Sequence, residues 1–138
     1  MKAAAPIALL LLAGCSGKAY DLAAGPVIYE CYGKLNKAAM ISVEGSHRAY
    51  LRLDGKAGTF AEWSSGERRF VEWPEGKLTL SADQATFAGT QREGEKAAQR
   101  SFTFDRRSGH LSDSIDLGEE GKFVFEATCS PRPGAPTV

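Results

Sequence analysis

Short apolar runs separated by turn-forming residues are the feature that most constrains the fold of this chain. No long segment repeats its apolar residues with the 3.6-residue period of a helix. Closely spaced short strands predict an all-β fold, a small antiparallel sandwich or barrel. Turn signals between the runs are Asp54-Gly55, Ser65-Gly66, Pro74-Glu75-Gly76, Ser108-Gly109 and Glu120-Gly121. The runs cover 26–32, 38–43, 48–53, 57–63, 68–73, 77–81, 84–88, 98–105, 110–117 and 121–129.

The start of the chain has the layout of an export signal, with a basic residue, an apolar stretch and small residues at its end. Residues 3–13 carry no charge, but this run is shorter than the about 20 apolar residues that a membrane-spanning helix needs. It leads into Leu12-Ala13-Gly14-Cys15, which resembles the lipobox of bacterial lipoproteins. The resemblance implies that Cys15 is acylated and that residues 1–14 are removed. Two or more acyl chains then make a stable membrane anchor.

The resemblance also indicates where the protein is held. Ser16, and not an aspartate, follows the cysteine, and by similarity to sorted Gram-negative lipoproteins this favours the periplasmic face of the outer membrane. The inner membrane and the cell surface are the alternatives. Residues 15–25 are then the lipidated N-terminus and a tether, and a segment of this length reaches at most about 35 Å. The β domain spans 26–129, and the proline-containing segment 130–138 is predicted to be a flexible tail.

The charge of the chain is balanced, with 17 Lys+Arg and 17 Asp+Glu. This balance argues against a protein that binds nucleic acid. The sequence contains no phosphate-binding loop, dinucleotide fingerprint or zinc motif, so we expect no cofactor and no metal. The partners that we expect are the lipid bilayer, through acylated Cys15, and an envelope protein or a cell-wall component.

The two remaining cysteines, Cys31 and Cys129, lie near the two ends of the domain. An exported domain is in an oxidising compartment, where disulfides persist. Strand alternation places both cysteines on the face that also carries Tyr29 and Phe125, which we expect to line the core. We therefore predict a Cys31–Cys129 disulfide. The alternatives are two free thiols or metal ligation, but neither cysteine has a second cysteine or a histidine at ligand spacing.

Two similar segments, FAEW at 60–63 and FVEW at 70–73, flank a turn and predict a hairpin. If the loop has an odd number of residues, Trp63 and Trp73 share a face, and if the number is even they lie on opposite faces. Either one face belongs to the core and the other is covered, which we prefer, or an aromatic patch is exposed for binding. The candidate binding residues are Trp63, Ser65, Arg68, Arg69 and Trp73.

A second hairpin is predicted around the four-residue loop 106–109. In this register Phe104 faces Leu111 and Phe102 faces Asp113. The segment before the hairpin, REGEKAAQR at 92–100, is predicted to be a charged loop, because Gly94 weakens a helix there. The core face of the hairpin is predicted to hold Phe102, Phe104, Leu111, Ile115 and Leu117.

Asp105, Ser108 and His110 lie close together in sequence at this second turn. A catalytic triad is defined by its geometry, and it also needs oxyanion donors and a pocket. An exposed turn indicates neither of these. We therefore predict no catalytic residues and no enzyme activity.

The first half of the domain resembles the periplasmic and membrane-bound inhibitors of C-type lysozyme. Tyr29-Glu30-Cys31 matches their early Y-x-C, and 65–70 matches their serine-glycine loop with one extra residue before the aromatic. The resemblance implies an inhibitory loop at Ser65 and the basic residues near it. The longer C-terminal third, with its hairpin around FDRRSG, departs from that pattern and resembles small exported bacterial proteins. We therefore expect a membrane-anchored lipoprotein with a binding or structural role, and the alternative is an inhibitor of C-type lysozyme.

Overall fold

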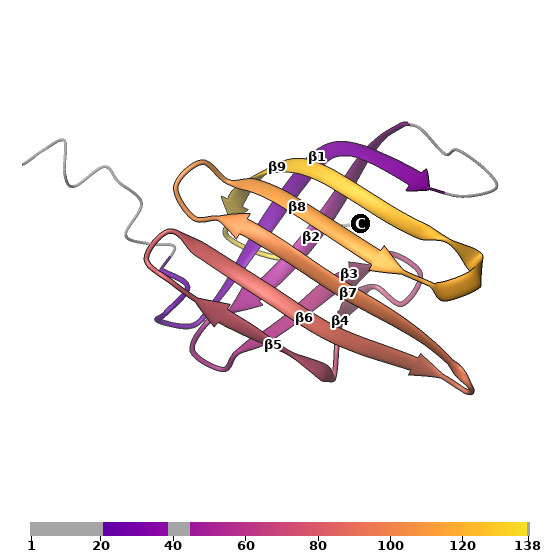
Figure 1. Ribbon diagram of the computed structural model, residues 1–138. Helices are drawn as coiled ribbons and strands as arrows, with labels where there is room; N and C mark the ends of the chain where they lie inside the picture. The colour runs from indigo at the N-terminus through magenta and orange to yellow at the C-terminus, as the bar shows by residue number, and fades with distance from the viewer. Residues whose placement is uncertain (1–20, 39–44, 138) are drawn as a thin grey trace, which may run out of the picture.

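The computed structural model describes residues 21–38 and 45–137. They form one antiparallel sheet that curls into a half-barrel (Figure 1). The predicted all-β, antiparallel fold is therefore confirmed. A short 3₁₀ turn, Gly118–Glu120, precedes the last strand. The strands are β1 (Pro26–Ala38), β2 (Gly45–Asp54), β3 (Thr59–Ser64), β4 (Arg69–Glu72), β5 (Glu75–Leu80), β6 (Gln84–Glu93), β7 (Lys96–Asp105), β8 (His110–Asp116) and β9 (Lys122–Arg132).

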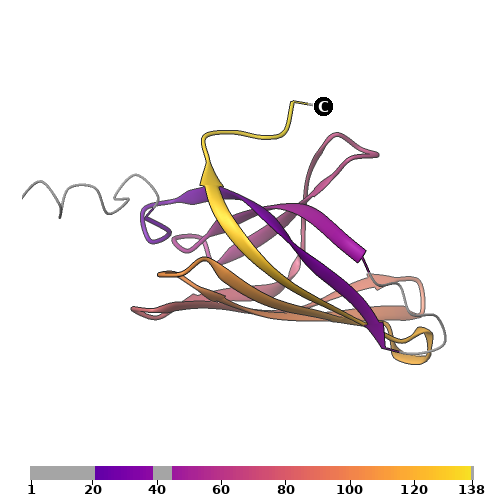
Figure 2. The same cartoon turned by 90° about the horizontal axis from the view of Figure 1, so that it is seen from above.

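The first and last strands pair with each other in the middle of the sheet. The strand order is β4-β3-β2-β1-β9-β8-β7-β6-β5, so β4 and β5 stand at opposite ends although they are consecutive in the chain. Curling brings these ends together, and the Leu78 amide of β5 donates to the Gly58 carbonyl just ahead of β3 at 2.9 Å. Figure 2 shows the two halves of the sheet facing each other across the interior. We call the surface that lines this interior the inner face and the opposite surface the outer face.

The inner face carries the hydrophobic core. Phe104 pairs with Leu111 and Phe102 with Asp113, which confirms the predicted register of the second hairpin. Ile115 and Leu117, also predicted on this face, are half-buried. The rings of Phe60 and Phe102, from opposite halves of the sheet, meet edge to face at 4.9 Å between centroids. The core consists of Leu22, Val27, Tyr29, Cys31, Ala49, Leu51, Leu53, Phe60, Leu78, Ala85, Phe87, Phe102, Phe104, Leu111, Phe125, Ala127 and Cys129.

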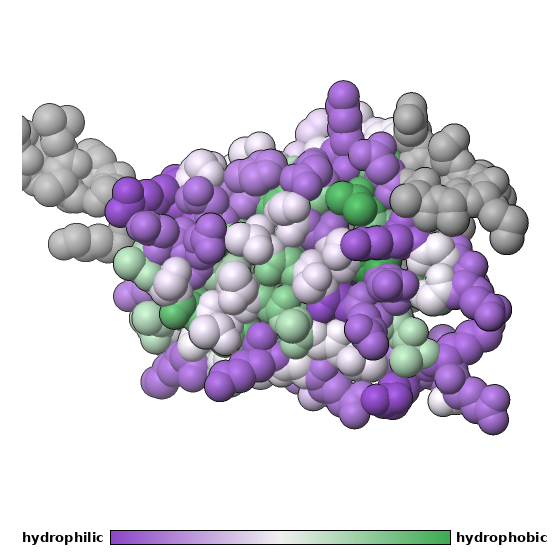
Figure 3. All heavy atoms as spheres, in the orientation of Figure 1, coloured by the Kyte–Doolittle hydropathy of each residue, from purple (hydrophilic) through white to green (hydrophobic). Residues whose placement is uncertain are grey.

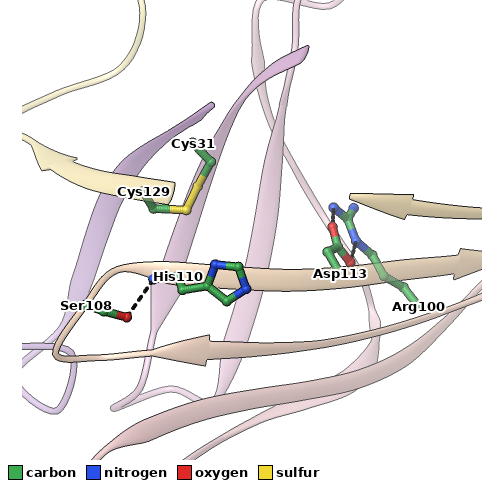
Figure 4. Close-up of a disulfide and its surroundings, with 6 residues drawn as sticks. All are labelled: Cys31, Arg100, Ser108, His110, Asp113 and Cys129. Atoms are coloured by element: carbon green, nitrogen blue, oxygen red, sulfur yellow. Dashed lines mark hydrogen bonds and ion pairs between the residues drawn. A yellow bond between two sulfur atoms is a disulfide. The ribbon is translucent and has the colours of Figure 1, made fainter. Parts of the chain in front are cut away.

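The predicted disulfide joins Cys31 of β1 to Cys129 of β9, and the prediction is confirmed (Figure 4). The two residues are direct partners in the register of these strands, and both are buried. Two residues further along β1, a Cβ at Gly33 would collide with the main chain of β9. Glycine at this position therefore lets β1 and β9 approach closely where the sheet curls.

The structure corrects the prediction of a charged loop at 92–100. β6 continues to Glu93 and β7 begins at Lys96, so only Gly94 and Glu95 form the turn between them. Gly94 has φ 65°, a conformation that suits a tight hairpin turn. The sequence pattern did not predict these strand ends, because their exposed, charged side chains show no alternation of apolar and polar residues. The predicted run at 38–43 lies almost wholly outside the described residues.

The folded part of the chain begins ahead of β1. Leu22, from the segment predicted as a tether, is fully buried against the core. Its carbonyl accepts a hydrogen bond from the Gly55 amide in the β2–β3 turn at 2.9 Å. The segment before β1 therefore covers one end of the half-barrel.

Candidate functional site

The hairpin of β3 and β4 separates the two candidate tryptophans. Trp63 pairs with Phe70 and Ser64 with Arg69, so the loop 65–68 has an even number of residues. Trp73 lies on the inner face, where it packs against the core and its ring centroid is 5.4 Å from the Arg100 guanidinium. Trp63 lies on the outer face, half-buried, with its ring against that of Phe70 at 5.2 Å. The two tryptophans therefore lie on opposite faces of the sheet, as expected for a loop with an even number of residues.

The tip of this hairpin holds the other three candidates. Figure 2 shows the hairpin projecting from the sheet, away from the end where the described chain begins. Ser65, Arg68 and Arg69 are all exposed. Arg69 forms an ion pair with Glu67 at 3.2 Å. Within the described part of the chain, Arg68 has no ion-pair or ring partner for its guanidinium.

The loop at this tip repeats the design of two other hairpin loops. Each has four residues, 55–58, 65–68 and 106–109, and the residue before each loop accepts a main-chain N–H hydrogen bond from within it. The acceptors are Asp54 for the amide of Ala57 at 2.9 Å, Ser64 for that of Glu67 at 3.2 Å and Asp105 for that of Ser108 at 3.0 Å.

The three loops differ in their last residue, which is left-handed in each. Gly58 has φ 75° and Gly109 has φ 80°, whereas Arg68 has φ 54°. Arg68 is the one non-glycine residue with positive φ in the described part of the chain. Its Cβ makes this conformation unfavourable by roughly 1–2 kcal/mol. Backbone strain of this kind concentrates at functional sites, so Arg68 is a candidate for function.

We expect Arg68→Gly to raise the free energy of unfolding by about 1 kcal/mol, because glycine adopts the left-handed conformation without strain. Urea unfolding followed by tryptophan fluorescence measures this change. Gly58→Arg, the reverse exchange in the matched loop, should lower stability instead. Equal stability of wild type and Arg68→Gly would show that the loop stores no strain at Arg68.

An array of rings and arginines covers the outer face of β1 to β4 and the end of β9, beside this hairpin. We call it the aromatic–arginine face and define it by Tyr32, Arg48, Tyr50, Arg52, Trp63, Phe70 and Arg132. Arg52 reaches across the small Ala61 of β3, its partner in the register, to the Phe70 ring of β4. Three guanidinium carbons lie over rings, Arg48 over Tyr32 at 5.5 Å, Arg132 over Tyr50 at 5.0 Å and Arg52 over Phe70 at 5.2 Å from the centroids.

The carboxylates on this face bind its arginines only loosely. Glu30 is 3.8 Å from both Arg48 and Arg132, and Glu72 is 3.4 Å from Arg52. These distances are longer than those of a good charge-assisted hydrogen bond, about 2.7–2.9 Å. The rings therefore hold the guanidinium groups in place while their N–H edges remain able to take a further anion.

Sequence reasoning identified only Trp63 of this face. Its members come from five strands, and their approach depends on pairings between distant parts of the chain. One local signal was present, because Arg48, Tyr50 and Arg52 alternate along β2 with the buried residues Ala49 and Leu51. This alternation puts three candidate binding side chains on the solvent side of one strand.

The outer face of the other half of the sheet has a different character. Figure 3 views it over β6 to β8, where pale side chains of intermediate hydropathy fill much of the middle. Short hydroxyl side chains dominate its cross-strand rows. These rows contain Thr86 with Thr103 and Ser112, and Ala88 with Ser101 and Ser114. Neither row supplies a ring or a cation.

A buried charged cluster crosses the interior. Arg100 of β7 forms two hydrogen bonds with Asp113 of β8, at 2.6 and 3.1 Å, and one with Glu62 of β3 at 2.6 Å. The side chains of Arg100 and Asp113 are each 2% exposed, and that of Glu62 is 33% exposed. β3 and β7 belong to opposite halves of the sheet, so the Arg100–Glu62 pair connects the halves. Figure 4 shows Arg100 and Asp113 pointing toward each other.

Burial and charge act in opposite directions within this cluster. Burial disfavours the charged form of Arg100, but Glu62 and Asp113 outweigh it and raise the pKa of Arg100 above its usual value. Burial raises the pKa of Asp113, against the hydrogen bonds and charge of Arg100. The Arg100 guanidinium also lies 4.7 Å from the centroid of Phe60. The cluster is fully engaged, which indicates a structural role.

The turn with Ser108 and His110 has no triad geometry. His110 turns its Nε2 to Glu126 at 3.0 Å, and only its main-chain amide donates to Ser108 Oγ, at 3.2 Å (Figure 4). Asp105 accepts the main-chain N–H groups of Ser108 and Arg107, which lower the pKa of its carboxyl. All of these contacts shape the turn.

Comparison with known proteins does not assign this chain to a family. No family model, curated protein or solved structure matches this chain. Over residues 21–38 and 45–137 there is no helix long and apolar enough to cross a membrane. The same residues hold no group of three or more His, Cys, Asp or Glu side chains that could bind a metal ion. Cys15 lies outside the described residues.

Proposed function

We propose that this protein is a lipid-anchored binding module of the bacterial cell envelope, held by acylated Cys15 at the periplasmic face of the outer membrane. The lipobox resemblance of Leu12-Ala13-Gly14-Cys15 supports the anchor. The aromatic–arginine face supports the binding role and is the observation that carries it. Rings and arginines are enriched at the centres of binding surfaces, and here they lie outside the core of the domain.

The position of the anchor fits this role. Five residues, 16–20, lie between Cys15 and Asp21, and the six steps of chain from Cys15 to Asp21 span at most about 20 Å. The described chain begins at one end of the sheet, and the β3–β4 hairpin projects at the other side (Figure 2). An anchored domain would therefore hold its Leu22 end near the bilayer and present the hairpin away from it.

The anchor is tested by labelling cells with a fatty-acid analogue and separating their membranes. Wild-type protein should carry the label and sediment with the outer membrane, whereas Cys15→Ser should be unlabelled and leave the membranes. Labelled Cys15→Ser, or unlabelled wild type, would overturn the proposed anchor.

Binding is tested with wild type and Arg48→Gln/Arg52→Gln after lipids are extracted from the envelope with detergent. Only wild type should remain with the insoluble envelope material.

Inhibition of C-type lysozyme is the second candidate function. The exposed Ser65 at the tip of a projecting hairpin favours it, since an inhibitor needs a loop that enters a cleft. Purified protein should then slow the lysis of a cell-wall suspension in a stoichiometric manner, and removal of Ser65 and Gly66 should abolish the effect. Unchanged lysis with a folded, oxidised protein would exclude this function.

A further inference from the structure

We infer that the aromatic–arginine face binds a glycan strand that carries carboxylate groups, either on its sugars or on peptides attached to them. The inference rests on the proposed function and names the chemistry of the partner. A carboxylate matches the two-pronged N–H edge of a guanidinium group. The C–H face of a sugar ring matches the apolar face of an aromatic ring. A face that combines guanidinium groups with aromatic rings is complementary to a polymer that offers both carboxylates and sugar rings.

The charge of the face supports an anionic partner. The face and the adjacent tip hold five arginines, Arg48, Arg52, Arg68, Arg69 and Arg132, against three glutamates, Glu30, Glu67 and Glu72, which gives 5 − 3 = +2. The whole chain has a net charge of 0. The balanced composition therefore conceals a local excess of positive charge, and such an excess attracts anionic ligands.

The geometry supports ligand binding at little additional ordering cost. Three guanidinium groups are already held over rings at 5.0–5.5 Å. Side chains that are ordered before binding lose less entropy when a ligand arrives. Tyr32 is 54% exposed, so part of its ring is available for a sugar.

Arg68 adds a cation at the hairpin tip, two residues before Phe70 in the chain. It occupies the left-handed position where the two matched loops have glycine. Arginine at this position lowers the stability of the domain relative to glycine, as expected if the guanidinium group contacts a ligand. Lipid headgroups also carry anions, but the anchor would place the bilayer at the opposite end of the domain. The position of the tip thus favours a ligand in the periplasmic space.

The probe for this inference is purified peptidoglycan sacculi, a glycan polymer whose attached peptides carry free carboxylates and which can be sedimented. Processed wild-type protein in mild detergent should pellet with sacculi, and high salt should release it. Arg48→Gln/Arg52→Gln should weaken the apparent affinity by about tenfold. Arg92→Gln/Lys96→Gln, which removes the same charge from the exposed β6–β7 hairpin, should change it by less than about twofold. Chitin, a neutral glycan, should not pellet the protein.

Arg68 gives a readout that a structural role would not produce. Arg68→Gly should bind sacculi several-fold more weakly while its urea midpoint rises. Arg48→Lys/Arg52→Lys keeps the charge but loses the planar N–H edge of the guanidinium group. Its apparent affinity for sacculi should therefore lie between those of wild type and the glutamine variant. Circular dichroism and the urea midpoint confirm that each variant is folded.

Three results would overturn the inference. Equal binding by wild type and the folded Arg48→Gln/Arg52→Gln variant would place the glycan elsewhere. Equal pelleting with chitin would exclude recognition of carboxylates. The third result is that the protein does not bind sacculi, although wild type and not Arg48→Gln/Arg52→Gln stays with the extracted envelope. The face would then bind a different partner, such as an acidic protein, and the proposed function would stand. If wild type and Arg48→Gln/Arg52→Gln also behave alike in the extracted envelope, both the inference and the proposed binding role are rejected.

Discussion

Replacing Cys31 and Cys129 together by alanine is expected to lower the free energy of unfolding by about 3–5 kcal/mol. The disulfide closes a loop with a sequence separation of 98. In the chain-entropy account, a cross-link over about 100 residues removes enough freedom from the unfolded chain to give roughly 4.7 kcal/mol, and measured effects are often smaller. Urea unfolding of the oxidised wild type and the double variant, followed by tryptophan fluorescence, measures the difference.

A reducing agent provides the control for this prediction. It should lower the urea midpoint of wild type toward that of Cys31→Ala/Cys129→Ala and leave the double variant unchanged. Both cysteines are buried, so alanine also leaves a small cavity, which reduction alone does not create. The gap between reduced wild type and the double variant isolates this packing loss. Equal urea midpoints for oxidised and reduced wild type would contradict the expected role of the disulfide.

The fold was predictable where strand alternation and turn chemistry agree. Period-two alternation put Cys31 and Cys129 on the core face, and a register with Phe104 opposite Leu111 kept apolar residues on one side. A slip by one residue would have sent these side chains to solvent, so the pattern determines the register. The same reasoning left the β3–β4 register open, because residues 60–63 and 70–73 carry aromatic residues on both faces.

The candidate site was much less predictable, because its side chains meet through pairings between distant strands. Arg132 reaches Tyr50 only because β9 lies next to β1, and no local pattern specifies that neighbour. The left-handed Arg68 was not predictable either, since this loop has glycine at its second position and not at its last. Asp113 was placed opposite Phe102 from the sequence, but its burial depends on Arg100 and on Glu62 from the other half of the sheet.

Replacing Arg100 by methionine is expected to lower the free energy of unfolding by about 3–5 kcal/mol at neutral pH, because it leaves the buried Asp113 carboxylate without its partner. Arg100→Met/Asp113→Leu should recover most of this loss, since it also removes the unpaired charge. Arg69→Met is the control, because it breaks the exposed pair with Glu67 and should cost less than about 0.5 kcal/mol. Urea unfolding of all three variants measures these effects.

The loss in Arg100→Met should depend on pH in a defined direction. Burial already raises the pKa of Asp113, and the variant lacks the opposing effect of Arg100, so the pKa should rise further. A carboxyl with a raised folded-state pKa favours folding at acid pH, and this contribution is lost as pH rises through that pKa. The deficit relative to wild type should therefore be largest at neutral pH and shrink in acid. A deficit that stays constant across this range would show that Asp113 carries no uncompensated charge, and that Arg100 stabilises the half-barrel through its packing on Phe60 and Trp73.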